Sequence, residues 1–344
     1  MRFNPGTIYF VRETTDDQGG LSSSVKIGLV EDPRTAQQRL SEHQTGNPRK
    51  LVLNEDLLIH TDAVKYVESQ LHKTFAPHRI SGEWFRFDSE AAVREAADLA
   101  QTYAKQVGEK MPSFEKAKNL KLVLSEGNVR AASETILGIA KEVSLASLTI
   151  EAFDQLISRI DSVFKNVIAE EGPVALERII KVINVVPDPA FSVTEFKKEF
   201  NKSRPELIEK CTVEEPKLSE DFKLFVELTS DAFSKEVTDY ISTASSVIEK
   251  AIAEKDYFRL NELKLEIKRL KAPLEWIVES GEADIKVECG TAPGIAGVCS
   301  WVRKITTKKS FSSGILRELE PALYERFVIQ KEPYTREVFI GYKA

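Results

Sequence analysis

Two short stretches near the start of the chain decide its fold: Thr7-Ile8-Tyr9-Phe10-Val11 and Val25-Lys26-Ile27-Gly28-Leu29-Val30. Both are rich in β-branched and aromatic residues, which favour a pleated strand. The segment between them is polar and holds Asp16-Asp17-Gln18-Gly19-Gly20 followed by serines, a composition typical of a turn. The sequence therefore predicts a β-hairpin with a long connection.

Alternation along these strands divides their side chains between two faces. A period of two places Tyr9 opposite Ile8 and Phe10 in the first strand, and it places Lys26 and Gly28 opposite the aliphatic residues of the second. If the aliphatic faces are buried together, Tyr9 and Lys26 project towards one site. Gly28 would let a ligand approach the backbone closely there. An amphipathic hairpin with one solvated face would show the same pattern.

The elements that follow the hairpin complete a small domain. Asp32 and Pro33 suit the N-cap and the first turn of a helix, and Thr61 suits the N-cap of a second one. The resulting β-β-α-β-α-β unit of about ninety residues is large enough to fold alone, so the sequence predicts an α+β domain over residues 1–90. The predicted elements after the hairpin are a helix at 34–45, a strand at 51–59, a helix at 61–75 and a strand at 84–87.

The first predicted helix carries Arg39 and His43, four residues apart and therefore on one face. A planar guanidinium is well shaped to hold a phosphate oxygen, and an imidazole beside it can transfer protons near neutral pH. A pair of surface residues would have the same spacing.

The second predicted helix carries a carboxylate on its apolar face. Val64, Leu71 and Phe75 define that face, and Glu68 falls on it beside His72. A carboxylate turned towards a core is costly unless it is paired with a cation or binds a metal. A buried salt bridge, for example to Arg39, is the alternative to a metal site.

The order of these parts resembles the GIY-YIG nuclease superfamily over about residues 5–90. Within it, the chain is most similar to the phage open-reading-frame branch (the T-five type), often labelled a DNA-binding domain. The segments that carry this resemblance are Ile8-Tyr9, Lys26-Ile27-Gly28, Arg39 with His43, Gln44-Thr45-Gly46-Asn47-Pro48, Glu68 with His72, and Gly82-Glu83-Trp84-Phe85.

The resemblance implies a role for each matching residue. Glu68 would hold a single divalent ion, Mg²⁺ or Mn²⁺, whose charge would stabilise the leaving oxygen. Arg39 would neutralise the scissile phosphate, and Gly28 would lie at the DNA-binding surface. Tyr9 would position or deprotonate the attacking water, with His43 assisting as a base or relay.

Two positions depart from the family pattern. Thr7 stands where the first motif begins with glycine, although Gly6 precedes it, and Lys26 stands in place of the second tyrosine. A desolvated lysine could act as a base, or it could stay charged and bind DNA phosphate. The sequence leaves both roles of Lys26 open.

The remaining three quarters of the chain read as helices followed by a strand-rich tail. Prolines between residues 187 and 216 suggest a boundary, and the mixed charges of 219–271 suit either a solvated helix or a coiled-coil arm that makes a homo-oligomer. The predicted regions are a helical domain at 91–210, with helices at 90–108, 121–142, 146–170 and 173–186, then a long helical segment at 217–282, and a small basic α+β module at 283–344.

The last sixty residues partly resemble the tail of YqaJ-type phage recombination proteins. The resemblance lies in Trp301, Phe311, Pro321–Phe327 and Arg336–Ile340, and Ser312 stands where an aspartate is expected. Aromatic residues among basic ones suit a strand-binding surface, although they would equally build a small β-rich core. The basic candidates for DNA contact are Arg303, Lys304, Lys308 and Lys309.

Composition excludes some classes of protein and favours others. The net charge of −6 does not by itself indicate a nucleic-acid binder, but a cleft needs only local positive potential. Three cysteines without CxxC spacing suit a reducing cytoplasm, and no apolar run is long enough to cross a membrane. The sequence thus favours a Mg²⁺- or Mn²⁺-dependent DNA endonuclease of phage, mobile-element or defence type. The alternatives are a non-catalytic DNA-binding protein of the same fold and a helical scaffold with a nuclease head.

Overall fold

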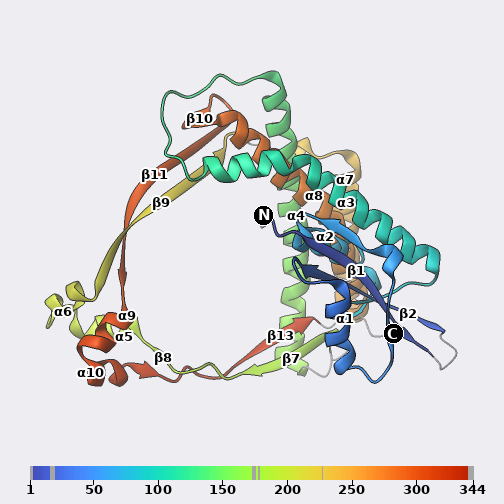
Figure 1. Cartoon of the computed structure of the whole chain (residues 1–344), viewed down its shortest axis with the longest axis horizontal. Helices are drawn as coiled ribbons and strands as arrows, with labels where there is room; N and C mark the ends of the chain where they lie inside the picture. The colour runs from blue at the N-terminus through green and yellow to red at the C-terminus, as the bar shows by residue number, and fades with distance from the viewer. Residues whose placement is uncertain (1–2, 16–19, 173–175, 177–178, 227, 340–344) are drawn as a thin grey trace.

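The computed structural model describes residues 3–15, 20–172, 176, 179–226 and 228–339, so most of the predicted hairpin connection at 16–20 and Ile340 lie outside the described residues. An antiparallel sheet domain is followed by long helices and then by narrow strand ribbons with a small helical cluster (Figure 1). This confirms the predicted α+β class. In the described residues, no helix has both the length and the apolar character that a membrane span requires.

The N-terminal sheet is built around the predicted hairpin. Its strands lie in the order β3-β1-β2-β6-β5, with β4 also paired to β1, and every pairing is antiparallel. In the hairpin Tyr9 lies opposite Gly28, and Val11 lies opposite Lys26. The strands are β1 (Gly6–Thr14), β2 (Leu21–Glu31), β3 (Leu51–Leu53), β4 (Ile59–Thr61), β5 (Arg79–Ser81) and β6 (Trp84–Arg86).

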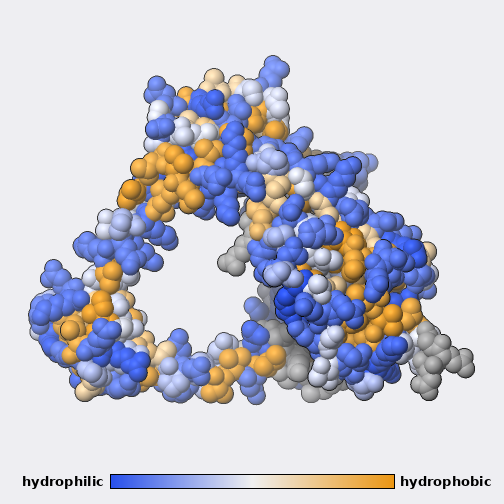
Figure 2. Space-filling view, viewed as in Figure 1, coloured by the Kyte–Doolittle hydropathy of each residue, from blue (hydrophilic) through white to orange (hydrophobic). Residues whose placement is uncertain are grey.

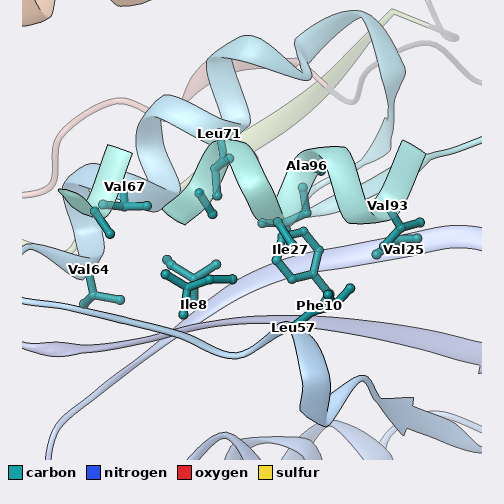
Figure 3. Packing of buried hydrophobic residues seen from close by; sticks show 14 of the residues in the cluster. Ile8, Phe10, Val25, Ile27, Leu57, Val64, Val67, Leu71, Val93 and Ala96 are labelled. Atoms are coloured by element: carbon teal, nitrogen blue, oxygen red, sulfur yellow. The ribbon is translucent and has the colours of Figure 1, made fainter. Parts of the chain in front are cut away.

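Helices cover both faces of this sheet. The face with Ile8, Phe10 and Ile27 packs against α2 (Val64–Thr74) and the first half of α3 (Glu90–Leu120), as Figure 3 shows. The face with Tyr9 packs against α1 (Ala36–Thr45) through Ala36 and Leu40. The sorting of side chains predicted from alternation is confirmed. Because Val93, Ala96, Ala100 and Val107 belong to the first core, the domain extends past the predicted limit at residue 90.

The helix caps differ slightly from those predicted. Helix α1 begins after Thr35, whose side chain accepts a hydrogen bond from the Gln38 amide, while Gln38 bonds back to the Thr35 amide. Asp32 and Pro33 lie in the turn before it. The predicted strand at 51–59 is divided into β3 and β4 by a single 3₁₀ turn, Glu55–Leu57.

The helical middle is one packed unit. Its longest helices are α4 (Glu134–Glu171) and α8 (Tyr257–Cys289), and α7 (Lys235–Glu254) packs against both. Helix α8 packs against α2, α3, α4 and α7, so it links the middle to the N-terminal domain. A side chain on Gly281 would collide with Val143, which explains how α8 can approach α4 so closely there.

The single long helix predicted at 219–271 is wrong. Residues 212–224 form strand β9 (Thr212–Leu224), a connection with a 3₁₀ turn at Ser230–Ala232 follows, and the helical part from Lys235 onward is divided between α7 and α8. The division falls at Lys255, which has the left-handed φ of 54°, and at Asp256, whose side chain caps α8 by accepting from the Arg259 amide. Because α7 and α8 pack on α4 of the same chain, the predicted homo-oligomer through this region stays a prediction.

Two other helical predictions also differ from the structure. Residues 121–133 are an extended connection, and the predicted helices at 121–142 and 146–170 merge into the single helix α4. Of the helix predicted at 173–186, residues 173–175 and 177–178 lie outside the described residues, and Ile180–Val185 form strand β7. Residues 180–185 read Ile-Lys-Val-Ile-Asn-Val, and their β-branched side chains favour a strand.

Narrow antiparallel ribbons connect the middle to a small cluster. Strand β9 pairs with β11 (Cys299–Phe311) along its whole length, and β7 pairs with β13 (Tyr334–Phe339). The ribbons and the cluster enclose an opening that the space-filling view shows clearly (Figure 2). The cluster comprises α5 (Val193–Phe200), α6 (Pro205–Lys210), α9 (Ser313–Leu319) and α10 (Pro321–Arg326), and β8 (Ala190–Phe191) pairs with β12 (Val328–Ile329) beside it.

The predicted boundary at residue 283 falls inside α8, which continues to Cys289. The tail does not form a module of its own, because its strand β11 pairs with β9. Its residues Phe311 and Phe327 also pack on Phe191 and Phe196, which come from the segment between β7 and β9. Two distant segments of the chain therefore build each ribbon and the cluster together. A third short strand, β10 (Gly294–Ile295), pairs with the start of β11.

Candidate active site

Tyr9 and Gly28 are in direct contact across the hairpin. The Tyr9 side chain is 1% exposed, and a Cβ added at Gly28 would lie 2.6 Å from its hydroxyl oxygen. The sequence predicted that a ligand would approach the backbone at Gly28, but in the structure the Tyr9 ring occupies this space. Any larger residue at position 28 would displace that ring.

The Tyr9 hydroxyl lies against Arg39 and His43 of α1. It accepts a hydrogen bond from Arg39 and lies 3.2 Å from Nε2 of His43. Ala36 and Leu40, buried on the same helix, anchor α1 to the sheet and so position Arg39 and His43 over Tyr9. The structure thus brings together three of the candidates that the sequence singled out.

The protonation states of this group follow from its burial. Burial raises the pKa of Tyr9 to about 12, and the hydrogen bond from Arg39 only partly opposes this, so Tyr9 is a neutral donor at pH 7. Burial, followed by the charges of Lys26 and Arg39, lowers the pKa of His43. His43 is then a neutral imidazole that can accept the Tyr9 proton.

Lys26 is held by a carboxylate that the sequence did not single out. Only 8% of Lys26 is exposed, and its Nζ forms an ion pair with Glu83, which precedes β6. Burial alone would raise the pKa of Glu83, but the hydrogen bond and charge of Lys26, with the charges of His72 and His43, lower it overall. The ionised Glu83 carboxylate therefore holds the Lys26 side chain in place.

Glu68 and His72 reach the free edge of β2. Strand β6 pairs only with residues 24–26, and beyond them the backbone of β2 is met by side chains of α2. The His72 ring donates from Nε2 to the Ile27 carbonyl oxygen at 2.9 Å, and the Leu29 amide donates to the Glu68 carboxylate. Because a carbonyl only accepts, this bond assigns the His72 proton to Nε2.

Glu68 is a desolvated carboxylate. Burial, followed by the charge of Glu83, raises the pKa of Glu68 to about 7, against the opposing charges of Lys26 and Arg79. The buried salt bridge to Arg39 considered from the sequence is absent, because Arg39 pairs with Glu42 at 2.8 Å. Within the described residues, no ion pair to Glu68 is formed.

Arg79 is a second cation that sequence analysis missed. Its guanidinium donates to the carbonyl oxygens of His72 and Gly82 and lies 5.0 Å from the centre of the Phe85 ring. Its positive charge acts on Glu68. In the sequence, the Gly-Glu-Trp-Phe segment predicted the strand at 84–87, but it gave no indication of a role for Arg79, which precedes it.

The donor set decides which metal the site could hold. In the parts of the chain that the structure describes, no group of three or more His, Cys, Asp or Glu residues converges as a metal cage. One desolvated carboxylate without a cationic partner suits Mg²⁺ or Mn²⁺, because such ions bind through one or two carboxylates and retain several waters. It does not suit zinc, which takes three or four protein ligands. Glu68 therefore fits the predicted ion.

The basic residues of the tail do not join this site. Strand β11 lies across the opening from the N-terminal sheet (Figure 1). Arg303 is 1% exposed and donates to the carbonyl oxygens of Leu120, Gly290 and Ala292, so it is not on a DNA-facing surface as predicted. Lys304, Lys308 and Lys309 are exposed, and Lys309 pairs with Glu214. Trp301 is buried in a hydrophobic core, in agreement with the alternative prediction that the aromatic residues of the tail build a core.

Comparison with known proteins finds a similarity in the N-terminal domain. No curated protein and no solved structure matches the chain. The matched segment includes every residue of the site described above and the first turns of α3. It confirms the similarity to the phage open-reading-frame branch, while the GIY-YIG and YqaJ similarities stay resemblances. Residues 6–101 match the family model of the T5orf172 domain.

Proposed function

We propose that the N-terminal domain is a Mg²⁺- or Mn²⁺-dependent endonuclease that hydrolyses DNA phosphodiester bonds in the manner of the GIY-YIG nucleases. The observation that carries this proposal is the half-buried Glu68, which has a raised pKa and forms no ion pair with any residue that the structure describes, and which lies near the Tyr9–Arg39–His43 group. A protein that only binds DNA gains nothing from a desolvated carboxylate, since this charge repels phosphate.

Glu68 is the residue that would hold the metal. An ion bound there would supply positive charge to the leaving oxygen of the phosphodiester. Lys26 and Arg79 keep Glu68 from being more strongly protonated, since both of their charges lower its pKa. Ionised Glu68 is the form that binds a cation. By lowering the pKa of Glu68, Lys26 and Arg79 increase the fraction of the protein in which this carboxylate is ionised.

Tyr9 and His43 form a proton relay. The attacking water gives its proton to the Tyr9 oxygen while the Tyr9 proton passes to Nε2 of His43, 3.2 Å away. The water oxygen bonds to phosphorus as the bond to the leaving oxygen breaks. The neutral state of His43 is what allows it to accept, and the positive charges of Lys26 and Arg39 maintain that state.

Arg39 binds the phosphate. Its guanidinium is partly exposed beside the Tyr9 hydroxyl, and its ion pair with Glu42 is at the surface, where such pairs are weak and readily exchanged. A phosphate group can replace Glu42 and accept two parallel hydrogen bonds from the guanidinium through two of its oxygens. Lys26, held by Glu83, contributes positive potential and is not the base.

Cleavage of supercoiled plasmid DNA with Mg²⁺ or Mn²⁺ tests the proposal. The parent protein should nick the plasmid, and Glu68→Ala and Arg39→Ala should not, while Glu55→Ala, an exposed carboxylate of the same domain, should cut normally. Normal cutting by folded Glu68→Ala would overturn the catalytic assignment. DNA binding by all four proteins without cutting by any would favour the non-catalytic DNA-binding protein.

A further inference from the structure

An apolar cavity of about 490 Å³ lies in the helical middle, between α4, α7 and α8. Its volume is within the range of small-molecule sites, roughly 300–1,000 Å³. Residues spaced three or four apart on each helix face it, so one side of each helix forms a wall. The apolar lining includes Leu145, Ala146 and Phe153 of α4, Val237 of α7, and Leu270 and Leu274 of α8.

The wall has few polar groups, and one of them has no hydrogen-bond partner. The Thr149 hydroxyl donates to the Leu145 carbonyl oxygen of the same helix at 2.8 Å. The Tyr240 hydroxyl is buried, and nothing that the structure describes forms a hydrogen bond with it. Buried hydroxyls of a completed core are paired, so this wall resembles that of a binding site more than that of a core.

Two carboxylates lie at the mouth of the cavity. Glu142 of α4 and Glu236 of α7 are exposed members of the lining, while Ala146 lies deeper and is buried. The ion pairs that α4, α7 and α8 form in the described structure involve other residues. Among the described residues that line the cavity there is no Lys, Arg or His. The mouth therefore carries negative charge without a basic counterpart in the lining.

We propose that this cavity binds an apolar molecule with one amino group, which holds its apolar part between α4, α7 and α8 and its ammonium group beside Glu142 and Glu236. An apolar body removes the lining from water, and the ammonium group supplies the cation that the mouth lacks. An acidic molecule of the same shape would meet like charges there and bind more weakly. The inference does not depend on the proposed nuclease, because Glu68 is not part of this cavity.

Binding of a fluorescent dye to the full chain tests the cavity. Nile red, a neutral apolar dye, should bind the parent protein with an increase in fluorescence. Ala146→Phe should abolish this binding, because the added ring occupies the cavity. Ala253→Phe is the matched control and should bind the dye normally, since Ala253 is an exposed residue of α7 outside the lining.

Displacement of the dye tests the charge of the ligand. Decylammonium and decanoate have alkyl chains of similar length and opposite charges, and both are used below the concentrations at which they form micelles. Decylammonium should bind about fivefold more tightly, the upper effect of an exposed ion pair. Glu142→Gln combined with Glu236→Gln should remove this difference. Glu151→Gln combined with Glu254→Gln changes the net charge equally at exposed positions outside the lining, and it should keep the difference.

Each part of the inference can fail separately. Dye binding by folded Ala146→Phe would overturn the cavity as the site, and equal displacement by decylammonium and decanoate would overturn the cationic ligand. Thermal melting checks folding, and Ile277→Trp is a second blocking variant at a more exposed position of the lining. Light scattering tests the other occupant. A parent dimer that Ala146→Phe converts to a monomer would assign the cavity to a second copy of the chain and reject the small molecule.

Discussion

The ring of Tyr9 lies across the neighbouring strand at Gly28, so closely that no side chain fits between them. We therefore expect Gly28→Ala to displace Tyr9 from His43 and Arg39. Overpacking of this kind costs about 1–3 kcal/mol of unfolding free energy, and DNA cleavage should fall more than stability. Denaturant unfolding and plasmid nicking measure the two effects. Gly46→Ala is the matched control, because no atom lies within 4 Å of a Cβ at that position. Equal behaviour of the two variants would contradict the role given to this contact.

Glu68 should make the metal-free protein less stable as the pH rises. Its pKa is raised from 4.5 to about 7 in the folded state, so the folded protein binds more protons than the unfolded chain between these values. The stability contributed by protonated Glu68 is then present below about pH 4.5 and is lost as the pH rises through about 7. Glu68→Gln should melt at a higher temperature than the parent at pH 8, and the difference should shrink towards pH 4.5.

Metal binding gives the same carboxylate a second test. At pH 8, Mg²⁺ or Mn²⁺ should raise the melting temperature of the parent protein, because a ligand that binds only the folded state stabilises it. The Glu68→Gln protein should not respond. A metal-induced rise of the same size in both proteins would place the metal elsewhere.

His43→Ala should slow cleavage without weakening DNA binding. A general base contributes about 10²- to 10⁴-fold to a rate, so kcat should fall within this range while KM changes little. His60→Ala provides the control, since His60 is an exposed histidine of β4. An increase in KM with an unchanged kcat would assign His43 to substrate binding.

Arg303→Met should destabilise the protein without changing its DNA binding. The substitution leaves the carbonyl oxygens of Leu120, Gly290 and Ala292 without their donor, and a buried network of this kind is worth about 2–4 kcal/mol. Thermal melting measures the loss, and the salt slope of DNA binding should equal that of the parent. A lower salt slope would restore the role in DNA contact that the sequence suggested.

The N-terminal site could be predicted where regular periodicity was long enough. Five or more alternating residues in β1 and β2 placed Tyr9, Lys26 and Gly28 on one face, and the i,i+4 spacing placed Arg39 beside His43. Glu83 and Arg79 could not be found in this way. They belong to three-residue strands and a turn through Gly82, at φ 54°, which are too short to show a period.

The middle and tail could not be predicted because distant pairing decides them. Residues 219–224 were predicted as the start of a helix from their mixed charges, yet they form the end of β9 because β11 lies beside them. Local propensity is a weak guide when the hydrogen bonds come from a distant partner strand, here one that begins at Cys299. Arg303 shows the same limit, since its burial depends on the connection at 121–133 and not on its own neighbours.

The ribbon of β9 and β11 also affects how this protein unfolds. Its residues from Lys304 to Ser310 are largely exposed, so little apolar burial links the small aromatic cluster at one end to the helical middle at the other. A second narrow ribbon, β7 with β13, joins the cluster on its other side. Cooperativity depends on shared burial, and segments joined only by narrow ribbons open independently. The cluster can therefore melt while the N-terminal domain and α8 stay folded. A single free energy of unfolding then describes neither part, and each substitution in this chain should be assigned to the unit in which it lies.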